Sequence, residues 1–186
     1  MRIMGAVTTR LTYEAYLALP EIKRRYDIVD GVLEYMSPSP TLPYQRLLRN
    51  LFLPMDRFVA RGKLGEVDFA PLDIIISKKP LRTRQADLLF ISKARLSIGK
   101  DQIEGPPDVV VEVLSPGNTP KKLQAKLEDY ATLGVPEVWV AAPFAKTVEV
   151  SRLERRRYRS AGICSAGSPV NTEILSGFSL PKDVFN

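Results

Sequence analysis

Glu112 lies inside a run of apolar residues, where a carboxylate is unusual. The run from Pro106 to Ser115 is rich in β-branched residues and is bounded by Pro-Pro and Ser-Pro-Gly, which predicts a strand covered on both faces. Burying a carboxylate there is costly unless a charge, a metal ion or hydrogen-bond donors compensate it. The alternative is that Glu112 reaches solvent, or a nearby lysine, at the end of the strand.

A second carboxylate, Asp87, opens the preceding predicted strand, Arg84 to Ile91. Strands that follow one another in sequence usually pair, so we expect Asp87 and Glu112 at one edge of a sheet. Two carboxylates there can hold a divalent cation that keeps several waters, and the backbone carbonyl of Val113 could be a further ligand. Because the chain has no His and a single Cys, this cation would be Mg²⁺ or Mn²⁺ rather than zinc.

A lysine is expected at the same place, on the helix predicted from Thr119 to Leu133. At about 100° per residue, Leu123 and Tyr130 mark the buried face, and Lys126 lies at its margin, pointing toward Glu112. A lysine at such a boundary commonly keeps its ammonium in solvent, which is the alternative. Two carboxylates, a hard metal ion and an ammonium are the groups that hydrolyse a phosphodiester. The metal polarises the phosphoryl oxygen and activates a water, and the ammonium orients that water or neutralises the phosphorane.

Basic residues point to a polyanionic partner. Lys121 and Lys122 lie in the first turn of the same helix, where the helix dipole disfavours cations, and positions that break a local rule are often functional. We expect them, together with Arg84, to contact nucleic acid. The chain carries 27 Lys and Arg against 21 Asp and Glu, a net charge of +6, although a solvated basic surface explains the same numbers.

The remaining elements predict one α/β domain over residues 1–186, a restriction-endonuclease-like fold with a central mixed β-sheet flanked by helices, an N-terminal helix and a hairpin. Asp30-Gly31 between alternating apolar residues predicts the hairpin at 26–36. Helices are expected at 13–19 and 44–59, the second kinked or broken at Pro54. One or two strands are expected at 67–77, another at 136–143 and a closing strand at 174–185. A basic hairpin is expected at 147–159, and loops at 37–43 and 116–118.

Other polar residues have a less specific setting. Asp73 could be a third metal ligand or a solvated carboxylate at a strand end. Asp27 could touch the site or stabilise the hairpin. The basic hairpin carries five arginines and Tyr158, which suit phosphates and bases but also a solvated surface.

Five runs of the sequence carry a family resemblance that extends over nearly the whole chain past Leu11. They are Tyr26–Pro40, Arg84–Asp87, Pro107–Pro116, Lys126 with Tyr130–Val135, and Ser176–Phe178. In these runs the chain resembles the bacterial Uma-two family of endonuclease-like proteins, within the PD-(D/E)xK restriction-endonuclease-like superfamily. The resemblance implies that Asp87 is the Asp of the motif and Glu112 its second acid. The motif lysine normally follows that acid by two residues, where this chain has Leu114, so the resemblance points to Lys126 on the following helix.

The chain also departs from the family pattern at four places. Tyr44 stands where relatives often carry a His at the start of the second helix, and Lys122 stands where an Asp is usual. Ala142 replaces the Asp after the Trp-containing strand, and Ala86 replaces the Pro before the motif Asp. These departures fit either an active variant of altered specificity or a degenerate copy that only binds.

The sequence thus predicts a metal-dependent nuclease acting on DNA. The rivals are a catalytically silent nucleic-acid-binding or scaffold protein that kept the fold, and a hydrolase of a small phosphorylated molecule. Cutting both strands of a duplex usually takes two active sites, so we expect a homodimer. With no apolar run long enough to span a membrane and a single Cys, we expect a cytoplasmic protein.

Overall fold

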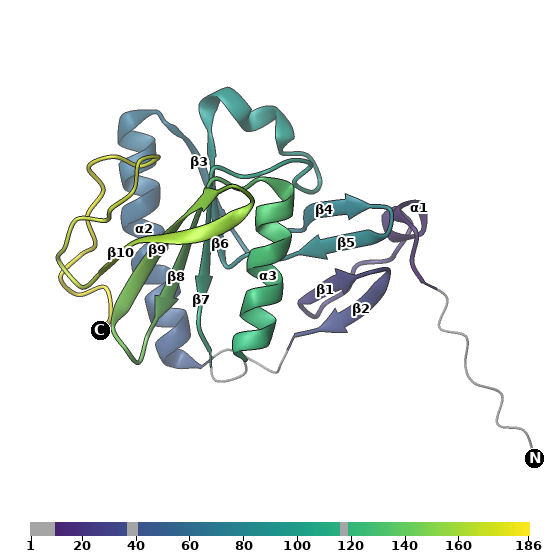
Figure 1. The fold of residues 1–186 in the computed structure, drawn as a ribbon, viewed down its shortest axis with the longest axis horizontal. Helices are drawn as coiled ribbons and strands as arrows, with labels where there is room; N and C mark the ends of the chain where they lie inside the picture. The colour runs from purple at the N-terminus through teal and green to yellow at the C-terminus, as the bar shows by residue number, and fades with distance from the viewer. Residues whose placement is uncertain (1–9, 37–40, 116–118) are drawn as a thin grey trace, which may run out of the picture.

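Two β-sheets, one large and one small, form the frame of the protein (Figure 1). The computed structural model describes residues 10–36, 41–115 and 119–186, so the predicted loop at 37–43 lies partly, and that at 116–118 wholly, outside the described residues. The large sheet has the strand order β10-β9-β8-β7-β6-β3 and the small sheet the order β2-β1-β5-β4. The strands are β1 (Tyr26–Val29), β2 (Val32–Tyr35), β3 (Gly65–Phe69), β4 (Ile74–Lys78), β5 (Leu81–Arg84), β6 (Leu88–Ser92), β7 (Val109–Val113), β8 (Glu137–Ala142), β9 (Thr147–Glu154) and β10 (Arg157–Cys164). The helices are α1 (Tyr13–Leu17), α2 (Leu42–Gly62), the 3-10 helix η1 (Lys93–Ile98) and α3 (Pro120–Leu133).

Strand β7 is the centre of the large sheet, and all five of its residues are buried. It pairs antiparallel with β6 and parallel with β8, and α3 makes the crossover between the two parallel strands. The predicted α/β fold, with its mixed sheet, N-terminal helix and hairpin, is confirmed.

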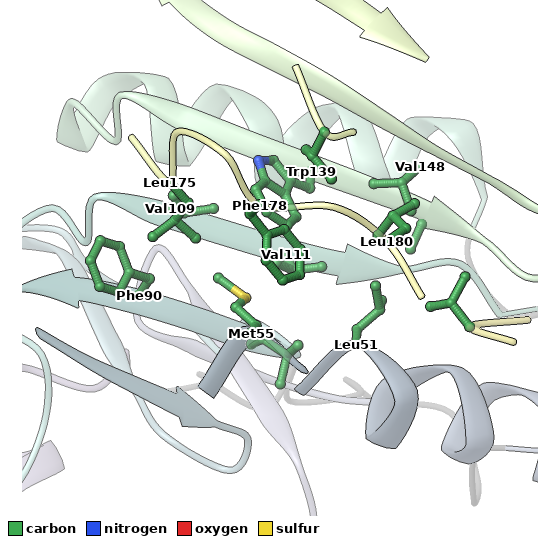
Figure 2. Close-up of a cluster of buried hydrophobic side chains, with 14 of the residues drawn as sticks. Leu51, Met55, Phe90, Val109, Val111, Trp139, Val148, Leu175, Phe178 and Leu180 are labelled. Carbon is green, nitrogen blue, oxygen red and sulfur yellow. The ribbon is translucent and has the colours of Figure 1, made fainter. Parts of the chain in front are cut away.

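Alternate residues of β7 face two different helices, because successive side chains of a strand point to opposite faces. Val109, Val111 and Val113 pack in a core with α2 and the C-terminal segment, where Met55 and Trp139 meet Val111 (Figure 2). Val110 packs in a second core with α3. Glu112 therefore points to the α3 side of the sheet.

The chain changes sheets at residues 85–87, which the sequence did not indicate. The single strand predicted at 84–91 is two strands: β5 ends at Arg84 in the small sheet, and β6 begins at Leu88 in the large one. In the same way, the residues predicted as one or two strands at 67–77 belong to β3 and β4, which lie in different sheets. Asp87 therefore lies at the junction of the two sheets.

Three other elements differ from expectation. Helix α2 runs through Pro54 without ending, and the basic hairpin is longer, with its turn at Arg155 and Arg156, both of which have a left-handed backbone. The predicted closing strand at 174–185 is wrong: the segment forms turns, with one isolated bridge from Pro169 to Ser179. Its apolar residues are buried at irregular spacing, which a strand with period two cannot match.

Among the described residues, no helix is both long enough and apolar enough to cross a bilayer.

Candidate active site

Asp87 is held in place by donors from three different parts of the chain. Its Oδ1 accepts hydrogen bonds from the Tyr44 hydroxyl at the start of α2 and from Arg25 Nη1 at 3.0 Å. Its Oδ2 accepts from the backbone N–H of Val113 at 2.7 Å. Asp87 is 4% exposed, and the register of β6 on β7 (Leu88 opposite Val111) places it across from Glu112.

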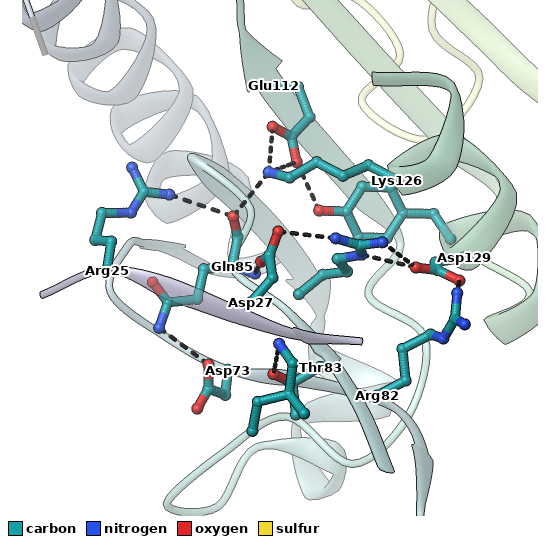
Figure 3. Close-up of polar contacts among 12 residues, drawn as sticks. Arg25, Asp27, Asp73, Arg82, Thr83, Gln85, Glu112, Lys126 and Asp129 are labelled. Atoms are coloured by element: carbon teal, nitrogen blue, oxygen red, sulfur yellow. Dashed lines mark hydrogen bonds and ion pairs between the residues drawn. The ribbon is translucent and has the colours of Figure 1, made fainter. Parts of the chain in front are cut away.

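Glu112 is bound by α3, as the helical phase of the sequence indicated. Lys126 Nζ donates to both carboxylate oxygens, at 2.9 and 2.8 Å, and the Tyr130 hydroxyl donates to Oε1 at 2.6 Å (Figure 3). Lys126 Nζ also donates to the backbone carbonyl of Gln85, at 3.2 Å. The placement of Lys126 beside Glu112 is therefore confirmed, and the alternative of an ammonium in solvent is wrong.

Burial and charge act in opposite directions on this pair. Burial raises the pKa of Glu112, the ammonium of Lys126 lowers it, and the nearby charge of Asp87 raises it again, for a net upward direction. Burial alone would lower the pKa of Lys126, but the carboxylates of Glu112, Asp27 and Asp87 raise it, so the ammonium keeps its charge at neutral pH. The site contains a protonated lysine bound between carboxylates.

Arg84 lies in a second layer of charges beneath the site. Its guanidinium donates to Asp27 Oδ2 at 2.9 Å and to Asp129 Oδ2 at 2.7 Å, and the arginine is 5% exposed. Asp27 Oδ1 accepts from the backbone N–H of Gln85, so the network ends on the residue whose carbonyl holds Lys126 (Figure 3). The prediction that Arg84 contacts nucleic acid is therefore wrong, because so buried and doubly paired a guanidinium cannot reach a phosphate.

Two carboxylates outside the central pair have structural partners. Asp27 belongs to the charge layer just described: it accepts hydrogen bonds from Arg84 and from the Gln85 backbone, and its charge also acts on Lys126. Asp73 accepts from the hydroxyls of Tyr16 and Tyr26 at 2.7 and 3.0 Å and from Gln85 Nε2 at 3.0 Å. Within the described ranges no three acidic or cysteine side chains are close enough to share a metal ion, so Asp73 is not a third ligand in this arrangement.

Lys121 and Lys122 are both exposed in the first turn of α3. The Thr119 hydroxyl accepts from the backbone N–H of Lys122 at 3.3 Å, which caps the helix. They lie at the N-terminal end of α3, one turn before Lys126, and are accessible to a ligand that approaches this end of the helix.

The two carboxylates keep enough free lone pairs to bind a hard divalent cation. Each carboxylate offers about four lone pairs. From the residues that the structure describes, Asp87 accepts three hydrogen bonds and Glu112 accepts three, with a single bond at Asp87 Oδ2 and at Glu112 Oε2. One oxygen of each can therefore still bind a metal that keeps several waters. Lys126 donates to Glu112 Oε2 and would compete with that metal, whereas Arg25 donates to the other oxygen of Asp87, Oδ1.

Sequence reasoning missed three groups of the site. Arg25 and the backbone carbonyl of Gln85 carry no sequence signal, since both depend on how the small sheet meets the large one. Tyr130 was assigned to the buried face of α3, but its position four residues after Lys126, on the same helix face, could have placed its hydroxyl near Glu112.

Comparisons with known proteins show the family and the fold of the chain. The family model of Uma2, described as "Putative restriction endonuclease", matches residues 13–183. Among solved structures, the chain is similar to the crystal structure of "a putative nuclease belonging to DUF820" from Anabaena variabilis ATCC 29413, with a TM-score of 0.76 and 16% identity over 94% of this chain and 97% of that one. At this identity the likeness concerns the fold. No curated protein matches.

Proposed function

We propose that this chain, which belongs to the Uma2 family, hydrolyses phosphodiester bonds in DNA with a bound Mg²⁺ or Mn²⁺. One observation carries the proposal: Lys126 binds both oxygens of Glu112, and Asp87 is held across from them. An ammonium and two carboxylates, all nearly buried at the junction of two sheets, are costly to desolvate, and such costs are common at functional sites.

Each side chain has a proposed role. Asp87 and Glu112 would hold the cation, with the Val113 carbonyl as a further ligand, and the cation when bound would polarise the phosphoryl oxygen and activate water. Lys126 would stabilise the negative charge that develops on the phosphorane.

Other groups position these three. Tyr44 and Arg25 fix the orientation of Asp87, and Tyr130 fixes that of Glu112. Lys121 and Lys122 would contact the phosphate backbone outside the site, because they are exposed at the helix end nearest to it.

Calorimetric titration with Mn²⁺ tests the metal site. We expect wild-type protein to bind Mn²⁺ and the double variant Glu112→Gln/Lys126→Met to lose that binding. The double variant is preferred because Glu112→Gln alone leaves a buried ammonium unpaired. Circular dichroism checks that it folds. Absence of Mn²⁺ binding by folded wild-type protein would refute the metal site.

The second candidate is a nucleic-acid-binding protein that has lost catalysis. The observation in its favour is that Arg25 and Lys126 already match the charges of Asp87 and Glu112 one for one. The site is then electrically complete without a metal. In this case the same titration gives no Mn²⁺ binding while DNA binding persists.

A further inference from the structure

All exposed aromatic side chains in the described ranges lie at one edge of the protein. They are Tyr35, Phe69 and Phe144, which are 52%, 56% and 78% exposed. The other aromatic residues of those ranges are buried or half-buried. Phe69 keeps an edge-to-face contact with the ring of Phe52, but Tyr35 and Phe144 project from the surface without packing in either core of the described chain.

Strand direction brings two of these rings to the edge that carries the candidate site. Strands β3, β7 and β8 run in the same direction, since β3 and β7 are both antiparallel to β6 and β8 is parallel to β7. Phe69 is the last residue of β3, and the next N–H, that of Ala70, donates to the backbone carbonyl of Asp87 at 3.2 Å. Phe144 lies in the turn after β8, and Val140 of that strand stands opposite Glu112.

Tyr35 reaches the same edge from the small sheet. It ends β2, and the following N–H, that of Met36, donates to the carbonyl of Arg25, whose guanidinium binds Asp87. In Figure 1 the end of β2, the start of α3 and the β8–β9 turn all lie along the lower side of the molecule. Tyr35 and Phe144 therefore lie at the edge of the fold that carries the carboxylates. The ring of Phe69 ends at the same edge but on the α2 face of the large sheet, where it packs edge to face against Phe52 at 5.1 Å between ring centroids.

Cations accompany the rings. Arg24 lies over the ring of Tyr35, with its Cζ 4.9 Å from the ring centroid. Lys146 is exposed in the same turn as Phe144, and Lys121 and Lys122 are exposed at the start of α3. Cations that follow a phosphate backbone, combined with rings on which bases stack, are the features of sites for single-stranded nucleic acid.

We propose that this edge binds nucleic acid with unpaired bases, so that the substrate of the proposed nuclease is a single strand or an unpaired segment of a duplex. The inference rests on the proposed function for the chemistry but not for the binding. A base inside a duplex is already stacked on both faces, so it offers no face to Phe144 or Tyr35. An unpaired base does, and each such contact contributes regardless of sequence. Duplex DNA would contact the cations of this edge but not stack on the rings.

Fluorescence anisotropy without divalent metal tests this proposal, because binding is then measured apart from cleavage. The probes are one labelled single strand and the same sequence as a duplex. Wild-type protein should bind the single strand more tightly. Phe144→Ala and Tyr35→Ala should each weaken that binding by about fivefold to a hundredfold, the range for one stacked base, and change duplex binding less than twofold. Phe144→Tyr, which keeps a ring, should bind as wild type.

Ile163→Ala is the matched control, since Ile163 is an exposed apolar residue (66%) on β10. It should leave both affinities unchanged. The proposal is overturned if wild-type protein binds the duplex more tightly or binds neither probe. It is also overturned if Phe144→Ala and Tyr35→Ala leave the affinity for the single strand unchanged. If Phe144→Ala changes the oligomeric mass in solution but not the affinity for nucleic acid, the proposal is overturned, and this edge instead binds a second copy of the chain. If the protein does not cleave nucleic acid, the proposed nuclease activity fails, but the binding measurements still test this proposal.

Discussion

Lys126 is a buried ammonium that donates hydrogen bonds to the carboxylate of Glu112 and to the backbone carbonyl of Gln85. It is 9% exposed, and its two shortest contacts are with Glu112, which is 1% exposed. Removal of one partner of a buried ion pair leaves the other charge uncompensated, which costs more than the pair itself contributes.

The stability of Lys126→Met should therefore depend on metal. Without metal, we expect a loss of about 3–5 kcal/mol in the free energy of unfolding, because Glu112 is left buried and unpaired. Mn²⁺ should restore part of this loss, since it takes the place of the ammonium at the carboxylate. Urea unfolding with and without Mn²⁺ measures both effects.

Lys122→Met is the control, because Lys122 is exposed on the same helix. It should change stability by less than about 0.5 kcal/mol, as is usual for surface substitutions. If Lys126→Met were as stable as wild type without metal, the ion pair of Lys126 and Glu112 would not contribute to the free energy of unfolding as proposed.

Much of the arrangement of the candidate site could be predicted from the sequence. Asp87, Glu112 and Lys126 could be identified from strand pattern and helical phase, since both are local properties. Arg25 could not, because its contact with Asp87 joins residues that are 62 positions apart and belong to different parts of the fold. Arg84 was misassigned because a sequence does not show whether a basic residue at a strand end faces solvent or a buried carboxylate.

Arg84 connects three elements: β5, which carries it, β1, which carries Asp27, and α3, which carries Asp129. Arg84→Met would leave two carboxylates buried with one cation fewer. We expect a loss of about 3–5 kcal/mol in the free energy of unfolding.

Arg159→Met supplies the comparison in the same urea experiment. Arg159 pairs with Glu154 at 3.1 Å, but the two side chains are 74% and 59% exposed. The expected loss is below about 1 kcal/mol, as for most surface pairs. Equal effects of the two substitutions would mean that Arg84 does not hold the small sheet against α3.

Helix α1 is attached to the body through two tyrosine hydroxyls, Tyr16 on Asp73 and Tyr13 on Glu104, and the second contact should be sensitive to acid. The Tyr13 hydroxyl donates to Glu104 Oε1 at 2.7 Å, and this bond, with that from Lys100, lowers the pKa of Glu104 to about 2. A depressed carboxyl pKa contributes stability above the unfolded-state pKa, near 4.3, and that stability is lost as the pH falls toward 2.

The difference in melting temperature between wild type and Glu104→Gln should therefore be present at neutral pH and shrink between pH 4.5 and 2. Differential scanning fluorimetry across this range measures it. A difference that stays constant down to pH 2 would show that the charge of Glu104 is not what attaches α1.

Most elements could be predicted from the sequence, but their distribution between sheets could not. The hairpin at Asp30-Gly31 and the capped helix α3 depend on turn and cap residues close in sequence. The change of sheets at 85–87 depends on buried pairs such as Arg84 with Asp129, which are distant in sequence. The C-terminal segment was misread because its apolar residues follow the shape of the core rather than a strand period.

For the molecule as a whole, we predict a homodimer. Two copies supply two active sites, one for each strand of an opened duplex, and twofold dimers are the commonest soluble oligomers. Light scattering at micromolar protein should give twice the chain mass of 20.8 kDa. A mass of one chain under these conditions would contradict the dimer but not the site.

The central claim is that Asp87, Glu112 and Lys126 form a metal-dependent nuclease site, and single-turnover cleavage of DNA with Mn²⁺ tests it most directly. Wild-type protein should cleave, and Lys126→Met should cleave more slowly by about two to three orders of magnitude, as expected when one donor to the transition state is lost. At saturating protein, Lys122→Met should retain the wild-type rate, because its lysine serves binding. The claim is contradicted if folded, Mn²⁺-bound wild-type protein cleaves neither single-stranded nor duplex DNA, or if Lys126→Met cleaves as fast as wild type.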